Sequence, residues 1–326
     1  MQAIVVEALG GPEVLTLREH PTPQPGPGHV LVRVQAIGVN FSDTERRRGT
    51  YGPPQLPYVP GNEAAGIVEA VGPDVDPSWR GRRVSFWAMR TSGAYAQFTA
   101  APVGALFRLR DEISFEQAAA LPAQGLTAYG LAHVVTSLRA GQSALVHAAA
   151  GGVGVILVQL LRRRGVRVFG TASSPAKQDI VRSLSAEALA YGPALPHQIR
   201  EATKGQGVDA VFDSVGQSTQ AASFAVLAPY GHLVYFGDAS GTPTPVDVEK
   251  LYGRSLHLSA FCLGTDPPER WHQARQELQE WVANGSLRLR LGRSYSLADA
   301  AQAHRDLEGR LTYGKLLLRP APLTTA

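Results

Sequence analysis

The stretch SALVHAAAGGVGVILVQLLRRRG, residues 143–165, decides the fold of this chain. Its first eight residues have the apolar composition of a fully buried strand, and the residues from Val153 onward have a helical pattern, so the glycines lie where a strand turns into a helix. Dinucleotide-binding loops carry G-x-G-x-x-G at this place, and here the three positions hold Ala149, Gly151 and Gly154. Backbone N–H groups at such a helix start can bind a pyrophosphate. The stretch therefore predicts a nucleotide-binding loop, with an ordinary tight turn as the alternative.

The surrounding sequence repeats this alternation of strand and helix. Strands separated by helices of 10 to 15 residues are typical of βαβ units, whose parallel sheet is covered on both faces. Right-handed crossovers make such a sheet doubly wound. The expected strands are 144–148, 166–171, 188–191, 210–214, 232–236 and a last one in HLSAFCLG (257–264), and the expected helices are 126–137, 152–164, 176–184, 197–203 and 219–227.

The two ends of the chain have a different texture. The first third holds short valine- and isoleucine-rich segments between glycine and proline, which indicates a β-rich, partly open barrel. After residue 265 come a helical segment, a second helix with Ser296 as its expected N-cap, and the strand-like GKLLLRP. We expect these last elements to return to the first domain. The predicted organisation is a β-rich domain (1–122), an inserted doubly wound domain (123–264) and a return to the first domain (265–326).

Composition and charge limit the class of protein. Of 326 residues, 44% are hydrophobic and 18% charged, which is typical of a globular chain. The net charge of +4 comes from scattered arginines without interleaved aromatic residues, so nucleic-acid binding is not favoured. Cys262 is the only cysteine, which excludes an intramolecular disulfide and fits a reducing compartment. No apolar run is long enough for a membrane span, and we expect a cytoplasmic location.

The strand after the glycine loop indicates which nucleotide binds. NAD-specific loops carry Asp or Glu about 20 residues past the glycines, on the ribose hydroxyls. Here the chain offers Thr171, Ser173, Ser174 and Lys177, and the first carboxylate is Asp179. Hydroxyls and a lysine can bind a 2′-phosphate that a carboxylate would repel. The sequence therefore favours NADPH.

Several motifs together resemble one family. PYVPGNEAAGIVEAVG (57–72), ALPAQGLTAYGL (120–131), HAAAGGVG (147–154) and FDSVG (212–216) are similar to the quinone oxidoreductase, or zeta-crystallin-like, branch of the medium-chain dehydrogenase/reductase superfamily. The resemblance runs from about Met1 to Arg319, and AAAGGVG is a form that this branch uses. It implies an α/β chain with a GroES-like β-rich catalytic domain, an inserted Rossmann domain, and a cleft between them.

The resemblance also implies the site residues. Catalytic positions beside the nicotinamide would be Asn40, Asp43, Tyr51 and Thr127, with Tyr51 the candidate proton donor and Asp43 positioning its neighbours. A packing role for Tyr51 and a turn or capping role for Asn40 remain alternatives. The implied cofactor contacts are Gly151, Gly152, Val153, Ser173, Lys177, Tyr191, Ser214, Gly216, Phe236, Gly237, Phe261, Leu263 and Lys315.

Zinc alcohol dehydrogenases share this architecture, so a metal site has to be considered. Their motif carries histidine in G-H-E and a cysteine near position 40, whereas this chain has Gly61-Asn62-Glu63 and Asn40. Catalytic zinc needs three protein ligands, and the nine histidines show no such spacing. We predict that the protein works without a metal. His147 and Cys262 are both expected to be packed residues, Cys262 in a strand core.

Without a metal, the predicted chemistry is hydride or stepwise electron transfer from nicotinamide C4 to a quinone. Reduction of an enone or 2-alkenal is the near alternative. A nucleotide-fold protein that binds RNA or senses redox state with little turnover is the alternative of another class. By analogy with the family, HLSAFCL lies at the sheet edge and pairs across a two-fold axis, so we expect a homodimer.

Overall fold

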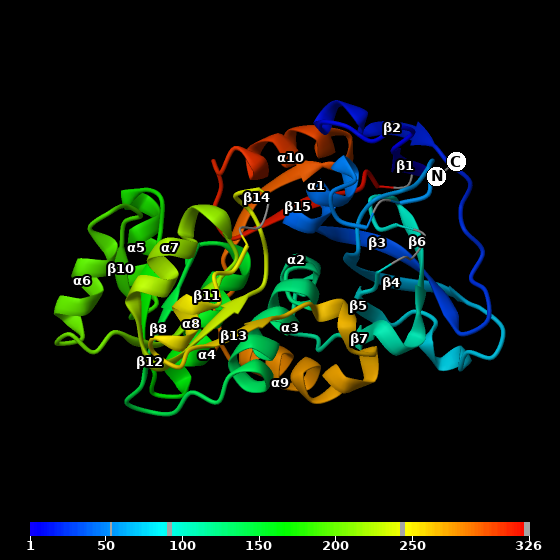
Figure 1. Cartoon of the computed structure of the whole chain (residues 1–326). Helices are drawn as coiled ribbons and strands as arrows, with labels where there is room; N and C mark the ends of the chain where they lie inside the picture. The colour runs from blue at the N-terminus through cyan, green and yellow to red at the C-terminus, as the bar shows by residue number, and fades with distance from the viewer. Residues whose placement is uncertain (53, 90–92, 242–244, 323–326) are drawn as a thin grey trace. The chain divides into compact units, whose positions relative to one another are not determined.

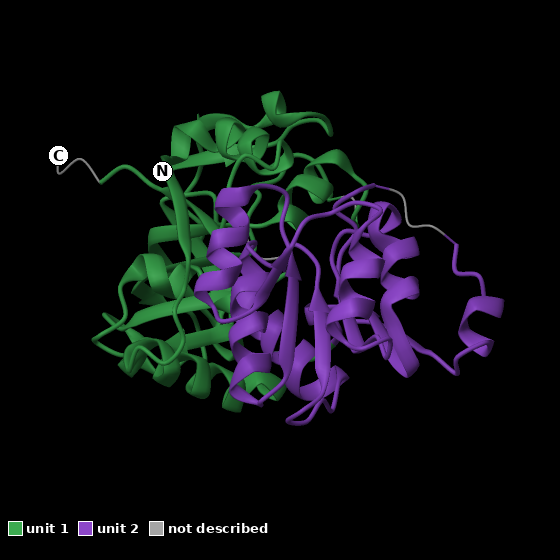
Figure 2. Ribbon diagram, turned by 90° about the vertical axis from the view of Figure 1, so that its left-hand side faces the viewer, with its two compact units in different colours: residues 1–123, 266–326 green, residues 124–265 purple. Residues whose placement is uncertain are grey.

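The computed structural model describes residues 1–52, 54–89, 93–241 and 245–322. The chain forms two compact units, shown in different colours in Figure 2. Unit 1 consists of Met1–Ala123 and Asp266–Ala326, and unit 2 of Gln124–Thr265. Unit 2 is therefore inserted between the two segments of unit 1.

Unit 2 is a six-stranded parallel sheet with helices on both sides (Figure 2). Its strand order, β10-β9-β8-β11-β12-β13, is the 3-2-1-4-5-6 order of the Rossmann fold. The strands are β8 (Ser143–Val146), β9 (Arg167–Thr171), β10 (Glu187–Leu189), β11 (Val208–Asp213), β12 (Leu227–Tyr235) and β13 (His257–Ala260). The helices are α3 (Pro122–Gly130), which starts in unit 1, a π-helix (Leu131–Val135), α4 (Gly152–Arg163), α5 (Pro175–Ser183), α6 (Leu195–Ala202), α7 (Gln217–Val226) and α8 (Glu249–Tyr252).

The apolar residues of unit 2 explain this arrangement. β8 is buried along its whole length, as the central strand of a sheet covered on both faces must be. Seven of the twelve residues of α4 are buried, while Arg162 and Arg163 lie in its last turn, where cations favour the helix dipole. Leu145, Phe169 and Val211 from three neighbouring strands meet in one core.

Unit 1 is built on a mixed sheet with the path β14-β15-β3-β4-β5-β7, in which β6 also pairs with β3. β1 and β2 form a separate antiparallel pair. The strands are β1 (Gln2–Val5), β2 (Thr16–Glu19), β3 (His29–Val39), β4 (Glu63–Val71), β5 (Arg83–Trp87), β6 (Phe98–Pro102), β7 (Leu106–Arg108), β14 (Leu291–Ser296) and β15 (Lys315–Arg319). The helices are α1 (Phe41–Arg48), α2 (Phe115–Ala119), α9 (His272–Ala283) and α10 (Ala300–Glu308).

Three local features differ from the sequence-based expectations. α1 begins directly after Asn40, in a region where no helix was expected. Ser296 is the N-cap residue of a 3-10 turn (Leu297–Asp299) that continues into α10 at Ala300, but its hydroxyl donates to Asp299 at 2.6 Å and makes no capping bond. Cys262 lies beyond β13 and is exposed, because the last strand ends at Ala260.

Among the described residues, no helix combines the length and the apolar character needed to cross a membrane.

Candidate functional site

The glycine loop of unit 2 leaves little room for side chains. A Cβ on Gly154 would lie 2.5 Å from the Ala148 carbonyl oxygen and 2.7 Å from Ala149 Cα, so only glycine lets α4 pack this closely on the loop. Gly151 is the N-cap residue, and the first α4 bond runs from the Val155 N–H to its carbonyl. The N–H groups before Val155 therefore have no acceptor within the helix and face the loop side of its N-terminus. This geometry suits an anion.

The missing first glycine has a local explanation. The left-handed φ of this loop, 51°, falls on Ala148 and not on Ala149. Tyr191 supports the loop at the same residue, because its hydroxyl accepts a hydrogen bond from the Ala148 N–H at 2.9 Å. The Tyr191 ring also stacks on His147, with centroids 5.9 Å apart. The predicted cofactor residue Tyr191 thus lies directly against the predicted pyrophosphate loop.

The other expected cofactor residues of unit 2 follow the carboxyl ends of neighbouring parallel strands, where ligands of such sheets bind. Ser173 is exposed after β9, and Lys177 lies in the first turn of α5, with its N–H donating to the Ser174 hydroxyl. Ser214 and Gly216, at a φ of 89°, follow β11. Phe236 and Gly237 follow β12, Phe261 lies where a Cβ on Gly130 would be, and Leu263 is buried.

A buried polar network lies beneath this edge of the sheet. His147 Nδ1 is 2.9 Å from the Thr171 hydroxyl, and Nε2 is 3.1 Å from the Ser223 hydroxyl. Ser223 donates to Asp213 at 2.7 Å, and the Gly216 N–H donates to the same carboxylate. Burial, partly offset by Asp213, lowers the pKa of His147. The expectation that His147 is a packed residue is confirmed, and its network ties the ends of β8, β9 and β11 together.

In unit 1, Asn40 and Lys315 meet at a buried carboxylate. Lys315 Nζ forms an ion pair with Glu63, and the two side chains are 1% and 0% exposed. Asn40 Nδ2 donates to Glu63 at 2.7 Å, Lys315 Nζ donates to Asn40 Oδ1 at 2.8 Å, and the Ala123 N–H donates to Glu63 at 2.7 Å. Both ends of the Asn40 amide are therefore fixed. Asn40 is also the N-cap residue of α1, where its own N–H donates to the Asp43 carboxylate.

Asp43 lies one helical turn after Asn40 and is 2% exposed. Its carboxylate accepts hydrogen bonds from the Asn40 N–H at 2.9 Å, from Asn62 Nδ2 at 3.1 Å and from the Tyr95 hydroxyl at 3.3 Å. Burial raises its pKa to about 6, and the Glu63 charge adds to the rise, whereas the Asn40 N–H, Lys315 and the Tyr95 hydroxyl oppose it. Asp43 therefore contacts both Asn40 and Asn62, and its positioning role stays a prediction.

Two predicted catalytic residues lie apart from these contacts along the chain. Tyr51 is in the loop after α1 and is 39% exposed. Thr127 is half-buried within α3.

The sequence analysis missed four residues that complete the unit 1 cluster. Glu63 was visible in Gly61-Asn62-Glu63 but was considered only for zinc. Tyr95, His304 and Arg47 form a buried chain that leads to Asp43. His304 comes from α10, far along the sequence from α1, and no local pattern connects the two.

The donor set of unit 1 does not fit zinc. Asn62 uses its amide N–H₂ to donate to Asp43, and Asn40 is held between Glu63 and Lys315. Within the part of the chain that the structure describes, no group of three or more His, Cys, Asp and Glu residues could hold a metal ion.

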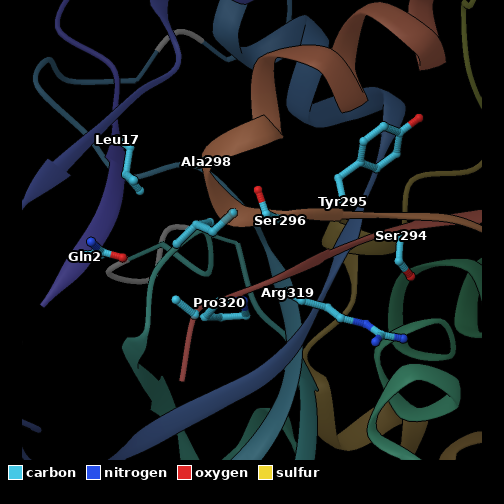
Figure 3. A pocket seen from close by; sticks show the side chains of 10 residues that line it. Gln2, Leu17, Ser294, Tyr295, Ser296, Ala298, Arg319 and Pro320 are labelled. Carbon is cyan, nitrogen blue, oxygen red and sulfur yellow. The ribbon is translucent and has the colours of Figure 1, made fainter. Parts of the chain in front are cut away.

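A surface cavity of about 420 Å³ lies elsewhere in unit 1 (Figure 3). It lies between the β1-β2 pair, represented by Gln2 and Leu17, and the ends of β14 and β15. Tyr295 points away from Gln2 and Leu17 in Figure 3, and its hydroxyl donates to Asp306. The predicted site residues are not among those that line this cavity, so it is separate from the candidate site.

Comparison with known proteins gives full-length matches. Residues 26–111 match the family described as alcohol dehydrogenase GroES-like domain, and residues 152–280 match that described as zinc-binding dehydrogenase. A quinone oxidoreductase of Pseudomonas aeruginosa is 41% identical over 96% of this chain and 98% of its own. A 2-haloacrylate reductase of a Burkholderia species is 35% identical over 98% and 99%. A mycobacterial protein solved in complex with NADPH superposes with a TM-score of 0.94 at 41% identity, covering 98% of this chain and 100% of its own.

Proposed function

Because this chain belongs to the quinone oxidoreductase family of the medium-chain dehydrogenase/reductase superfamily, we propose that it reduces quinones with NADPH. The observation that carries this proposal is the glycine loop of unit 2, followed along the sheet by Ser173 and Lys177, in a chain that is similar over 96% of its length to a quinone oxidoreductase. The similar mycobacterial structure was solved with NADPH. The enzyme is an NADPH:quinone oxidoreductase.

The residues of unit 2 fit the cofactor. Gly151, Gly152 and Val153 would hold the pyrophosphate at the start of α4, because a helix N-terminus with free N–H groups attracts an anion. Ser173 and Lys177 would bind the 2′-phosphate by a hydroxyl and a cation. Tyr191 lies against the loop and would close the ribose side of this site. When bound, the nicotinamide supplies a hydride at C4.

The residues of unit 1 would orient the substrate and donate a proton to it. Glu63 takes one hydrogen of the Asn40 amide, and the second remains for a substrate oxygen that gains charge on reduction. Lys315 and Glu63 keep this amide in one orientation. Tyr51 is the proposed proton donor, because its ring is partly exposed and its phenol carries an exchangeable proton. A hydride and a proton together would add two electrons and two protons to the quinone, so that both carbonyl oxygens become the hydroxyls of a hydroquinone.

We propose that this chemistry needs no zinc. Support comes from the donor set: amide groups of Asn40 and Asn62 stand where the zinc enzymes of this superfamily have ligands, and both are engaged in hydrogen bonds. Elemental analysis of the purified protein tests the point. Stoichiometric zinc that is required for turnover would contradict it.

A second candidate function is reduction of an enone or another activated alkene. The 2-haloacrylate reductase, 35% identical over nearly the whole chain, favours it specifically. A steady-state panel of 1,2-naphthoquinone, a 2-alkenal and 2-chloroacrylate, each with NADPH and NADH, tests both candidates. The highest kcat/KM is expected for the quinone with NADPH; a higher value for an alkene would replace the first candidate by the second. Absence of turnover with all three would refute both.

We also propose a homodimer and a cytoplasmic location. β13 is the last strand in the order of the unit 2 sheet, and pairing with a second copy would satisfy the N–H and C=O groups of its outer edge. A single cysteine fits a reducing compartment. Light scattering of the wild-type protein and of Ala260→Pro tests the dimer. The Phe261 N–H donates to Tyr235 of β12, so the N–H of the preceding residue, Ala260, points to the outer edge, and proline removes that donor. A monomeric wild-type protein would contradict it.

A further inference from the structure

A chain of hydrogen bonds inside unit 1 connects α10 to the first turn of α1. Arg47 Nη1 is 3.1 Å from His304 Nδ1, His304 Nε2 is 3.0 Å from the Tyr95 hydroxyl, and that hydroxyl is 3.3 Å from Asp43 Oδ2. Arg47, His304 and Tyr95 are completely buried, and Asp43 is 2% exposed. α10 and α1 lie side by side in Figure 1. The chain is thus shielded from water along its whole length.

The chemistry of Arg47 fixes the direction of every bond in this chain. A guanidinium group only donates, so His304 Nδ1 must accept. The proton of the neutral imidazole is then on Nε2, which donates to the Tyr95 oxygen. Tyr95 in turn donates its only proton to Asp43. Burial and the neighbouring Arg47 lower the pKa of His304 to about 3, so the imidazole stays neutral and the direction is kept at neutral pH.

The Arg47 charge itself is neutralised outside the chain. Nη2 of Arg47 pairs with Glu308 at 2.6 Å, and Nε donates to the Gly10 carbonyl at 3.0 Å. Since guanidinium does not release a proton, the chain does not conduct protons to the surface. What it delivers to Asp43 is a fixed donor.

The Asp43 carboxylate needs the Tyr95 hydroxyl as a donor if it is to stay ionised and act only as a hydrogen-bond acceptor. Its two oxygens accept from the Asn40 N–H, Asn62 Nδ2 and Tyr95, and all three bonds suit the ionised carboxylate. A protonated Asp43 would carry one proton that has to replace one of these donors. The titratable and charged groups that act on Asp43 or touch it through this network are Arg46 and Arg47 of α1, Glu63 of β4, Lys315 of β15, His304 of α10, and the loop residues Tyr58 and Tyr95.

We propose that Tyr95 and His304 are positioning residues of the reductase: they keep Asp43 ionised, so that Asp43 holds the start of α1, with Asn40, and the Asn62 amide in one orientation. This inference rests on the proposed function, because Asn40 is the residue proposed to meet the substrate oxygen. Neither Tyr95 nor His304 touches substrate or cofactor in this proposal. They act only through Asp43.

Three variants test the proposal. Tyr95→Phe keeps the ring and removes the donor, so the pKa of Asp43 should rise by about one pH unit, corresponding to the loss of one hydrogen bond to a charged group. His304→Leu should have the same direction of effect, whereas His304→Gln can accept from Arg47 and donate to Tyr95, and should restore the wild-type value. Tyr295→Phe is the matched control, because it also removes a hydroxyl bonded to a buried carboxylate, Asp306 of α10, but does not touch Asp43.

Two readouts separate positioning from folding. The first is the acid limb of the pH dependence of kcat/KM for quinone, which should move to higher pH by about one unit in Tyr95→Phe and stay in place in Tyr295→Phe and His304→Gln. The second needs no turnover: ¹³C NMR titration of carboxyl-labelled aspartates, with the Asp43 signal assigned from Asp43→Asn.

The outcomes distinguish this inference from the proposed function. An Asp43 pKa that is the same in Tyr95→Phe and wild type overturns the inference, whatever the activity. An acid limb that moves equally in Tyr295→Phe also overturns it, because the effect would then be general. A wild-type protein that reduces neither quinones nor alkenes overturns the proposed function. The NMR titration measures the pKa of Asp43 without turnover, so it tests the inference independently of activity.

Discussion

Replacing Lys315 by methionine removes the cation of the most buried ion pair in unit 1. Methionine fills a similar volume with an apolar chain, so the change in charge dominates over a change in packing. Glu63, which is 0% exposed, is left without its ion-pair partner, and Asn40 Oδ1 loses its donor. The expected result is a large loss of stability of unit 1.

The magnitude follows from what remains around Glu63. Breaking a buried pair on one side costs about 3–5 kcal/mol, because the remaining charge is buried and uncompensated. Two donors stay in place, Asn40 Nδ2 and the Ala123 N–H, both at 2.7 Å. We therefore expect the lower end, about 3 kcal/mol in the free energy of unfolding. In the double variant with Glu63→Gln the buried charge is gone, and more than half of this loss should be recovered.

The assay exploits the positions of the tryptophans. Trp79, Trp87, Trp271 and Trp281 are the four tryptophans of the chain, and all lie in unit 1. Urea unfolding followed by tryptophan fluorescence therefore reports on the unit that contains the ion pair. Arg33→Met is the matched control in the same unit, because it breaks a solvent-exposed pair with Glu69 and should cost less than about 1 kcal/mol.

Two results would refute this reasoning. One is a Lys315→Met variant within about 1 kcal/mol of wild type, as found for surface pairs. The other is a double variant no more stable than Lys315→Met, which would mean that packing of the lysine chain, and not the unpaired carboxylate, causes the loss.

Three further predictions concern the loop, the cofactor and pH. Gly154→Ala should abolish detectable NADPH binding by fluorescence titration, because its Cβ would meet the Ala148 carbonyl at 2.5 Å. Gly253→Ala, whose Cβ would meet nothing within 4 Å, should retain binding, and equal binding by both variants would contradict the packing argument. Lys177→Ala should raise KM for NADPH by roughly 10- to 150-fold and leave KM for NADH unchanged, since one charged hydrogen bond contributes about 1.5–3 kcal/mol; parallel changes in both KM values would exclude a 2′-phosphate contact. His304 has its folded-state pKa lowered from 6.5 to about 3, so the unfolded chain takes up its proton first and stability is lost as pH falls from about 6.5 towards 3. Urea midpoints should show wild type losing about 2 kcal/mol relative to His304→Gln between pH 7 and pH 5, and parallel pH profiles would contradict the burial of a neutral imidazole.

The sequence predicted the parts of the fold that depend on local pattern. The alternation in unit 2 predicted its parallel sheet, which the structure shows in the Rossmann order. Element ends differ by a few residues, as in β12, which starts at Leu227 and not at His232. α1 was missed because FSDTERRR has almost no apolar face: its buried residues are Asp43, Thr44 and Arg47. Periodicity of apolar residues cannot reveal a helix that packs through polar side chains.

The candidate site was predictable only where its residues are close in the chain. The glycine loop, Ser173 and Lys177 lie within the continuous segment from β8 to α5, and their spacing carries the signal. The partners of Asn40 and Asp43 come from β4, β15, α10 and the segment before β6, so they depend on tertiary contacts that a single sequence does not encode locally. Ala149 shows that a departure from the sequence motif can be misleading. The residue with left-handed φ in this loop is Ala148, so position 149 does not require glycine.

The place of β15 within the unit 1 sheet also has a consequence for how the protein is made. β3 is covered over Val30–Arg33 by β6, but its last residues, Ile37–Val39, pair with β15, which is translated after the whole of unit 2. While the ribosome is still reading unit 2, this end of β3 presents unpaired N–H and C=O groups on an apolar strand, the kind of edge that associates with other chains. The nascent first segment is therefore exposed to aggregation for the time that unit 2 takes to emerge, and chaperone capture at Ile37–Val39 would protect it until the C-terminal strand arrives.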